Sequence, residues 1–265
     1  MASSLLTGLA KKVVLVTGST SGIGRYAAVE FAKNGSRLAL TGRRRDALIE
    51  TAALCQQAGV SEECILRLEA DLENVDECKK VVSKTVDKFG QLDVLVNAAG
   101  ILTSGGIENL SLEDYDKQMN VNARALFVTT QEAVPHLKIT KGNIVNVSSV
   151  TGLRAFPGVL SYCMSKGAVD QLTRCAALDL AEYGIRCNSV NPGVIVTSLH
   201  KSAGMNDEAY QKFLEHSKST HALGRPGEAE EVAKAIVFLA SNQLSGFTTG
   251  VTLSIDGGRG VMCPR

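Results

Sequence analysis

The chain has 265 residues, of which 45% are hydrophobic and 21% are charged, and its formal net charge is +1. These proportions are typical of a globular protein with a large core, and the small net charge gives no reason to expect nucleic acid or an anionic membrane as a partner. No apolar run is long enough to span a bilayer, and the apolar stretch in residues 1–10 is too short for a signal peptide.

Apolar runs of strand length alternate with amphipathic segments of helical length along the chain. Strands are predicted at residues 13–17, 37–41, 65–70, 92–97, 143–148, 186–190 and 250–255. Helices are predicted between them, at residues 23–34, 46–58, 75–89, 112–137, 159–182 and 228–241.

Strands that are apolar on both faces are typical of a parallel sheet covered by helices. Right-handed crossovers between such strands give a doubly wound sheet. We therefore predict an α/β fold, in which a Rossmann-like parallel sheet of about seven strands carries helices on both faces. Because no proline-rich or low-complexity linker interrupts the alternation, residues 1–265 are expected to form a single domain.

A glycine-rich turn follows the first predicted strand. It carries Gly18, Gly22 and Gly24, and an amphipathic segment starts directly after it. The start of a helix presents unpaired N–H groups and the positive end of the helix dipole, and glycines let a ligand approach the backbone closely. The turn is therefore a candidate site for the pyrophosphate of a dinucleotide. An ordinary tight turn between strand and helix is the alternative interpretation, because a glycine-rich turn alone is a weak signal.

Three arginines, Arg43, Arg44 and Arg45, follow the second predicted strand. In dinucleotide-binding folds an acidic residue near this place bonds the adenosine ribose, whereas an arginine accommodates a 2′-phosphate. Cations at the start of a helix also oppose its dipole, and a bound phosphate would remove that conflict. Arg43 therefore favours NADP(H) over NAD(H), whereas the alternative interpretation of the three arginines is a solvated run of charges.

Ligands of doubly wound sheets bind at the carboxyl ends of the strands. The third to sixth predicted strands are each followed by small or polar residues, namely Asp71, Asn97-Ala98-Ala99-Gly100, Ser148-Ser149 and Asn191-Pro192-Gly193. We expect these turns to gather at one edge of the sheet, beside the glycine-rich turn.

Tyr162 and Lys166 are four residues apart near the start of a predicted helix, so they share one helix face. A phenol titrates near 10 and is a poor acid–base catalyst at neutral pH unless a neighbouring cation stabilises the phenolate. No other tyrosine in the chain has a lysine four residues later. Ser149, at the end of a predicted buried strand, has a hydroxyl that can donate to a substrate oxygen. These residues indicate acid–base chemistry, and the alternative interpretation of the Tyr–Lys spacing is a chance surface pair.

In combination these motifs resemble the short-chain dehydrogenase/reductase family, over nearly the whole chain from residue 13 to about residue 258. The glycine-rich turn resembles the family's cofactor turn, and Tyr162-x-x-x-Lys166 is its signature. Residues 97–100 resemble its Asn-Asn-Ala-Gly element, with Ala98 in place of the usual second asparagine, a departure that we do not expect to affect the chemistry. Ser149 lies at the family's usual interval before the tyrosine, and the Asp-Gly-Gly tail at residues 256–258 also fits.

The resemblance implies four catalytic residues. Tyr162 would protonate the carbonyl oxygen as hydride arrives from the nicotinamide, or deprotonate the alcohol in the reverse direction. Lys166 would bond the nicotinamide ribose and lower the pKa of the tyrosine. Ser149 would polarise the carbonyl, and Asn122, which matches the family's fourth catalytic residue, would hold a water in a proton relay from the lysine.

The resemblance also implies where the cofactor lies, with Asp71 near the adenine and residues 192–197 near the nicotinamide carboxamide. The expected cofactor contacts are Gly18, Ser21, Gly22, Ile23, Gly24, Arg43, Asp71, Leu72, Asn97, Ala98, Gly100, Tyr162, Lys166, Pro192, Gly193, Ile195 and Thr197. Residues 198–224 resemble the family's substrate lid, although their amphipathic pattern also fits a helix packed on the core. The family usually assembles as homotetramers, so a homotetramer or homodimer is expected.

The seven cysteines form no Cys-x-x-Cys pair, and the four histidines show no ligand pattern. No metal site is therefore expected, and the odd number of cysteines fits a reducing, cytoplasmic location.

The sequence thus predicts an oxidoreductase that transfers hydride between NADP(H) and a carbonyl or secondary alcohol, including a 3-oxoacyl-type substrate. An NAD(H)-dependent alcohol dehydrogenase and a non-catalytic NADPH-binding protein are the alternatives. Nothing in the sequence selects the substrate.

Overall fold

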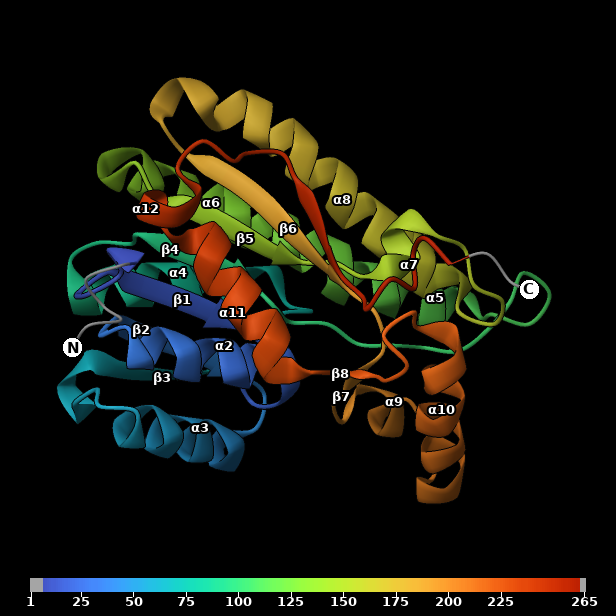
Figure 1. Ribbon diagram of the computed structural model, residues 1–265. Coiled ribbons are helices and arrows are strands. Elements are labelled where there is room, and N and C mark those ends of the chain that lie inside the picture. Colours follow the sequence, from blue (N-terminus) through green and yellow to red (C-terminus); the bar gives the residue numbers. More distant parts are fainter. Residues whose placement is uncertain (1–6, 263–265) are drawn as a thin grey trace.

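The structure, a computed structural model, describes residues 7–262. Seven parallel strands form one sheet in the order β3-β2-β1-β4-β5-β6-β9 (Figure 1). The chain winds from β1 to one edge and then returns through β4 to the other, which confirms the predicted doubly wound α/β fold. Ligands of such sheets bind where the winding reverses, and here that point lies between β1 and β4.

The observed strands agree closely with the predicted ones. They are β1 (Val13–Thr17), β2 (Arg37–Gly42), β3 (Ile65–Glu69), β4 (Val94–Asn97), β5 (Asn143–Val147), β6 (Arg186–Pro192) and β9 (Thr252–Ile255). The longer helices are α2 (Gly22–Lys33), α3 (Arg45–Gln57), α4 (Val75–Phe89), α5 (Leu112–Met119), α6 (Ala125–Thr140), α8 (Leu160–Leu180), α10 (Asp207–Thr220) and α11 (Ala229–Ala240). Shorter elements are the helices α7 (Val150–Leu153), α9 (Leu199–Ser202) and α12 (Asn242–Ser245), the 3₁₀ turns η1 (Glu62–Cys64) and η3 (Ala181–Tyr183), and the two-residue strands β7 (Ile195–Val196) and β8 (Gly227–Glu228).

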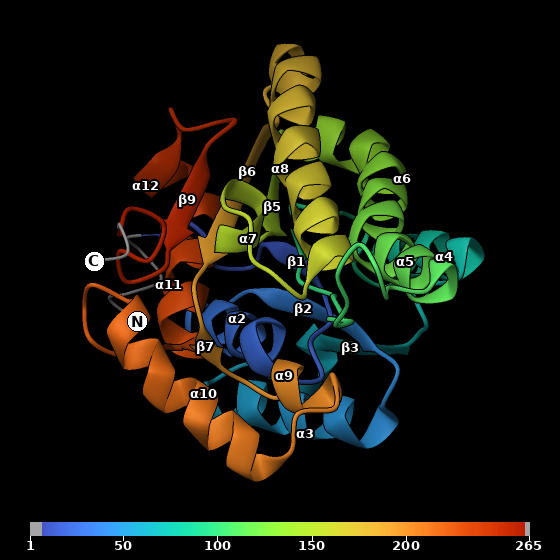
Figure 2. The same cartoon turned by 90° about the vertical axis from the view of Figure 1, so that its right-hand side faces the viewer.

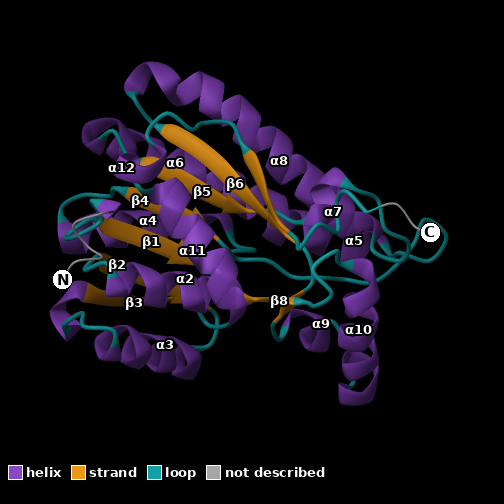
Figure 3. Cartoon of the chain, viewed as in Figure 1, coloured by secondary structure: helices purple, strands orange, loops and turns teal. Residues whose placement is uncertain are grey.

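Helices cover both faces of the sheet (Figure 3). Alternate residues of the strands face opposite sides, so Val14 and Val16 join a core with α2, α3 and α11, while Val13 and Leu15 join a second core with α4, α6 and α8. All four side chains are fully buried. Each buried side chain of this kind contributes about 1.5–3 kcal/mol to folding, which is why β1 stays fixed at the centre of the sheet.

The helix predicted over residues 112–137 is interrupted. It divides into α5 and α6, and between them lies a π-helical turn, η2 (Asn120–Arg124). A π turn inserts one residue and shifts the apolar face by one position, but the turn is so short that the sequence pattern does not reveal the break. The turn contains Asn122, one of the four predicted catalytic residues.

Residues 198–224 lie beyond the carboxyl ends of the strands. They contain α9 and α10, which lie in the lower part of Figure 2, a view onto the carboxyl ends of the strands. The paired strands β7 and β8 flank this segment and join its two ends to the main fold. Among residues 7–262, no helix combines the length and apolarity needed to cross a membrane.

Candidate active site

The turn after β1 can only be built with glycine at two positions. Gly18 has a φ of +65°, and a Cβ there would lie 2.6 Å from the Cα of Ala99. A Cβ on Gly24 would lie 2.4 Å from the backbone oxygen of Gly18. Both contacts are with backbone atoms that cannot move aside. The glycines therefore bring the start of α2 against the end of β1, as a closely approached phosphate requires.

The start of α2 has no anion of its own. The Ser21 side chain makes no capping hydrogen bond, and the first turn of the helix contains no acidic residue. Its N–H groups are thus available to a ligand. Gly22, with a φ of +51°, faces the loop after β6, since a Cβ there would lie 3.2 Å from Thr197 Cγ2. The Ile23 side chain packs against the core and holds the helix in place.

Thr17 joins the turn after β1 to the turn after β4. Its Oγ1 accepts hydrogen bonds from the N–H groups of Ala98 and Ala99, at 3.0 and 3.1 Å. These two turns flank the point where the winding of the sheet reverses. The predicted contacts on both turns therefore lie side by side.

The side chain of Asn97, a predicted cofactor contact, forms hydrogen bonds within the fold. It donates to Asn146 Oδ1 at 3.0 Å and to Thr130 Oγ1 at 3.2 Å, and it accepts from Thr129 Oγ1 at 2.8 Å. These bonds tie β4 to β5 and α6. Only the backbone at this predicted contact remains available to a cofactor.

The predicted adenosine end lies at the ends of β2 and β3. Gly42 packs on the cofactor turn, because a Cβ there would lie 2.5 Å from Thr20 Cγ2. Arg43 follows directly and is exposed. Asp71 accepts a hydrogen bond from the Glu73 N–H at 3.1 Å, and Leu72 is buried. Arg43 therefore offers an exposed cation beside the turn, whereas the Asp71 carboxylate is partly engaged by its own loop.

Ser149, Tyr162 and Lys166 come together at the carboxyl end of β5. Ser149 is the N-cap of α7, where its Oγ accepts from the Thr151 N–H at 3.1 Å. Tyr162 and Lys166 occupy one face of α8 and are 8% and 4% exposed. The lysine Nζ lies 5.5 Å from the centre of the tyrosine ring and donates to the Val147 carbonyl at 2.8 Å. This burial excludes a chance surface pair.

The two ionisable groups are shifted in opposite directions. Burial raises the pKa of Tyr162 to about 12, and the nearby Ser149 hydroxyl opposes that change. Burial lowers the pKa of Lys166 to about 8, and Asp170 opposes this change. At neutral pH the tyrosine is therefore a protonated acid, and the lysine a desolvated cation close to its pKa.

Asn122 is fixed by the π turn and faces the same region. Its Oδ1 accepts from the Ile101 N–H at 2.8 Å, and its Nδ2 donates to the Ile101 carbonyl and to Ser165 Oγ, at 2.9 and 3.1 Å. A Cβ added to Gly100 would lie 3.5 Å from Asn122 Oδ1 and 3.7 Å from Lys166 Nζ. Gly100 therefore keeps a small space open between the asparagine and the lysine.

Asp170 is a site residue that the sequence analysis missed. Its carboxylate accepts from Asn191 Nδ2 at 3.0 Å, and the same amide donates to the Ser149 carbonyl at 3.0 Å. Asp170 is one helical turn beyond Lys166 and is 1% exposed. It thus orients the amide behind the serine. The spacing of four residues after Lys166 is the one signal in the sequence that indicates this position.

The loop after β6 is held by two residues of the 198–224 segment, one within α10 and one directly after it. Tyr210 of α10 donates its hydroxyl to the Thr197 carbonyl at 2.9 Å. His221, which is 3% exposed, accepts from the Val194 N–H through Nε2 at 3.1 Å, and its Nδ1 lies 2.8 Å from the Ser217 carbonyl. These partners assign the neutral tautomer with the proton on Nδ1.

The remaining predicted contacts belong to this loop. Pro192 ends β6, and Gly193 donates to the Ile255 carbonyl of β9 at 3.1 Å. The Ile195 side chain is buried.

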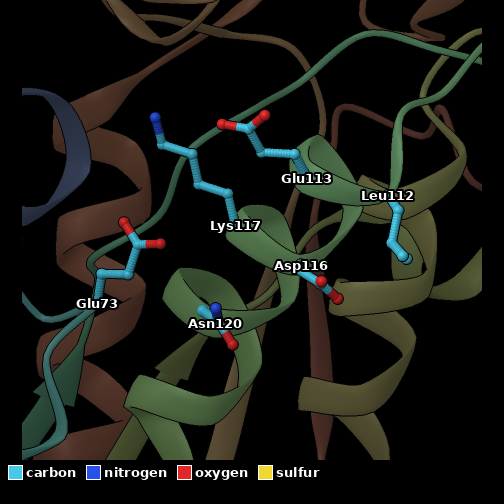
Figure 4. A pocket seen from close by; sticks show the side chains of 6 residues that line it. All are labelled: Glu73, Leu112, Glu113, Asp116, Lys117 and Asn120. Carbon is cyan, nitrogen blue, oxygen red and sulfur yellow. The ribbon is translucent and has the colours of Figure 1, made fainter.

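A surface hollow of about 620 Å³ lies outside this site, over the start of α5 (Figure 4). It is lined by Glu73, Leu112, Glu113, Asp116, Lys117 and Asn120. None of these residues belongs to the predicted site. In the part of the chain that the structure describes, no group of three or more His, Cys, Asp or Glu side chains is arranged to hold a metal ion.

Known proteins resemble this chain over nearly its whole length. Residues 18–259 match the family model described as enoyl-(acyl carrier protein) reductase. An uncharacterised oxidoreductase of Thermotoga maritima is 40% identical, with 93% of this chain and 96% of that protein covered. The 3-oxoacyl-[acyl-carrier-protein] reductase FabG of the same organism is 38% identical, over 93% and 97%. A short-chain dehydrogenase/reductase of unknown function from Caenorhabditis elegans, solved with cofactor, superposes with a TM-score of 0.91 at 38% identity, covering 96% of this chain and 97% of that one.

Proposed function

The chain belongs to the short-chain dehydrogenase/reductase family and is an oxidoreductase of CH–OH or carbonyl groups, and we propose that it transfers hydride between NADP(H) and a carbonyl or secondary alcohol substrate. The observation that carries this proposal is the burial of Tyr162 and Lys166 on one helix face beside Ser149. A protein that only binds the nucleotide needs no such arrangement.

The cofactor supplies the hydride when it is bound, in the cradle formed by Gly18, Gly22 and Gly24. In reduction, the Ser149 hydroxyl donates a hydrogen bond to the substrate oxygen and orients it. The Tyr162 hydroxyl, which is protonated at neutral pH, donates its proton to the same oxygen, although burial raises its pKa and so opposes the transfer. The Lys166 ammonium stabilises the phenolate that remains.

Asn122 supports the return of a proton to the lysine. Its side chain is engaged by Ile101 and Ser165, so a relay water is held by backbone rather than by the amide. Gly100 keeps the space between Asn122 and Lys166 open for that water.

The preference for NADP(H) rests on Arg43. The residue after β2 is a cation, not the acid that would bond a free ribose hydroxyl, and it is exposed beside the cofactor turn. A charge-assisted pair with a 2′-phosphate contributes about 1.5–3 kcal/mol. Losing it corresponds to an increase of about 10- to 100-fold in the Michaelis constant for NADPH.

A panel of aldehydes, ketones and secondary alcohols, assayed with each cofactor in turn, tests the function. Tyr162→Phe is expected to lower kcat by about 10²- to 10⁴-fold on every accepted substrate. Arg43→Ala is expected to weaken the binding of NADPH but not of NADH, while Arg45→Ala, which removes the same charge at the first position of α3, is the matched control. Unchanged turnover in Tyr162→Phe would show that the mechanism is wrong. Equal effects of Arg43→Ala on both cofactors would remove the 2′-phosphate assignment, and NADPH binding without turnover would identify a nucleotide-binding protein.

A homotetramer is proposed from two exposed apolar faces. On α6 and α8, Phe127 is 50% exposed and Leu178 is 80% exposed. Near β9 and α12, Leu244 and Phe247 are also exposed. Two separate faces of this kind fit two kinds of subunit contact, as a closed tetramer needs. Sedimentation velocity distinguishes the tetramer from a dimer that uses only one face.

A cytoplasmic location is proposed from the thiols. The six described cysteines are unpaired, and burial raises the pKa of Cys55 and Cys187 to about 12, which protects both from oxidation. Fractionation of cells that express the protein tests this location.

A further inference from the structure

We propose that Arg259 binds a carboxylate of the substrate, so that the preferred substrates are oxo acids or hydroxy acids rather than neutral carbonyl compounds or alcohols. This inference rests on the proposed function, because it assigns the substrate class of the same site. It comes from the position of the turn after β9 and from the charge that this turn presents.

The turn at residues 256–260 lies against the catalytic region. A Cβ on Gly260 would lie 3.7 Å from Cγ2 of Val150, the residue that follows Ser149. A Cβ on Gly193, in the loop after β6, would lie 3.0 Å from the Cα of Asp256. Residues 256–260 thus lie between α7 and the predicted nicotinamide loop.

The same turn also touches the end of the 198–224 segment. The Leu223 N–H donates to the Gly257 carbonyl at 3.0 Å, and a Cβ on Gly258 would lie 2.8 Å from Cβ of Ala222. Three parts of the fold therefore fix the backbone from which the Arg259 side chain projects. A cation placed in this way loses little conformational entropy when it binds a ligand.

The Arg259 side chain extends over the loop between the serine and the tyrosine. Its guanidinium carbon lies 4.8 Å from the ring centre of Phe156, which stands between Ser149 and Tyr162 in the sequence. Stacking on an aromatic ring fixes the plane of a guanidinium and leaves its N–H edge available. That edge suits a bidentate carboxylate.

The neighbouring carboxylate is already engaged. Asp256 accepts from the N–H groups of Gly258 and Gly260, at 3.0 and 2.7 Å. Within residues 7–262, no carboxylate forms an ion pair with Arg259. Arg259 is half-buried, and burial lowers its pKa while Asp256 opposes this change. A desolvated cation without a paired anion gains most from binding one.

The acidic residues of the segment facing this arginine, Asp207, Glu208 and Glu215, are paired with Lys201, Lys212 and Lys218. His200 of α9 stacks near Phe213 with 4.4 Å between ring centres, and its pKa is lowered by burial and then by the charge of Arg259. The pKa of His221 is likewise lowered by burial and, in part, by Arg259. The groups that interact with Arg259 are thus Phe156, the two histidines and Asp256. Apart from Asp256, none of them repels an anion.

The test compares acids with their esters. Straight-chain oxo acids with the carbonyl at different positions, and their methyl esters, are assayed with the wild type, Arg259→Met and Arg259→Lys. The wild type is expected to prefer at least one acid over its ester by about 10-fold or more in kcat/KM. Arg259→Met is expected to raise KM for that acid by about 10- to 100-fold and to change KM for the ester by less than about twofold. Arg259→Lys retains part of the preference, and serves if the Met variant does not fold.

Arg37→Met is the matched control, because Arg37 stacks over Phe89 at 5.7 Å from its ring centre and starts β2, at the opposite end of the sheet. It is expected to leave the preference for acids unchanged. Equal losses for acid and ester in Arg259→Met would show that the arginine only clamps the loop, and an absent preference in the wild type would also overturn the proposal. Neither result affects the proposed function, which fails only if no carbonyl compound or alcohol in any panel is turned over.

Discussion

Replacing Lys166 by methionine is expected to stabilise the protein while it abolishes turnover. The lysine is 4% exposed, and burial lowers its pKa from 10.5 to about 8. At about 1.4 kcal/mol for each pH unit, the charged form costs about 3 kcal/mol of stability below pH 8. Methionine has a similar length and no charge. It removes this cost and also removes the 2.8 Å hydrogen bond to the Val147 carbonyl, whose loss costs about 1–2 kcal/mol.

The net gain at neutral pH is therefore about 1–2 kcal/mol, or about 2–6 °C in Tm. The sign follows from proton binding. Between the two pKa values the unfolded state binds more protons than the native state, so the wild type becomes more stable as pH rises from about 8 toward 10.5. The cost of the charge falls to about 1.4 kcal/mol near pH 9.5, and the advantage of the variant disappears there.

Urea denaturation of both cofactor-free proteins, at about pH 7 and about pH 9.5, measures this difference. Lys79→Met, on the exposed side of α4, provides the control, because an exposed lysine carries no burial cost. A Lys166→Met variant less stable than the wild type at neutral pH, with a difference independent of pH, would refute the reasoning. It would mean that the ammonium is well compensated where it lies.

Two further predictions concern the glycine turn and the residue behind the serine. A Cβ on Gly24 would lie 2.4 Å from a backbone oxygen. Gly24→Ala is therefore expected to lower the free energy of unfolding by about 1–3 kcal/mol. It is also expected to raise the dissociation constant of NADPH, measured by fluorescence titration, by at least about 10-fold. Gly167→Ala, where a Cβ meets nothing within 4 Å, is the control, and unchanged binding in Gly24→Ala would place the phosphate elsewhere. Asp170 raises the pKa of Lys166, so Asp170→Asn is expected to move the alkaline fall in reductive kcat to lower pH. A profile that keeps its position while Tm falls would limit Asp170 to a structural role.

The order of the elements could be predicted because it depends on local patterns. Each buried strand and each amphipathic helix shows its own periodicity, and the turns between them carry glycine or small polar residues. The cofactor turn and the Tyr–Lys pair are also local, since each lies within one short segment. The π turn at residues 120–124 was not predicted, because a shift of one residue within a long helical segment is too small to be seen in the apolar pattern.

The missed residues depend on partners that are distant in the sequence. Asp170 meets Asn191 across 21 residues, His221 meets Val194 across 27, and the Arg259 side chain lies on Phe156. A single sequence shows each of them as an isolated polar residue, which is more often a solvated side chain. Asn97 shows the reverse case, because its position at the end of a strand indicates a ligand contact while its side chain is saturated by the fold.

The two anchors of the 198–224 segment have a mechanical consequence. Tyr210 and His221 both hold the backbone of residues 194–197, so the predicted substrate lid and the predicted nicotinamide loop are mechanically one piece. A movement of the 198–224 segment would therefore carry residues 194–197 with it, and the two predicted binding regions would open together.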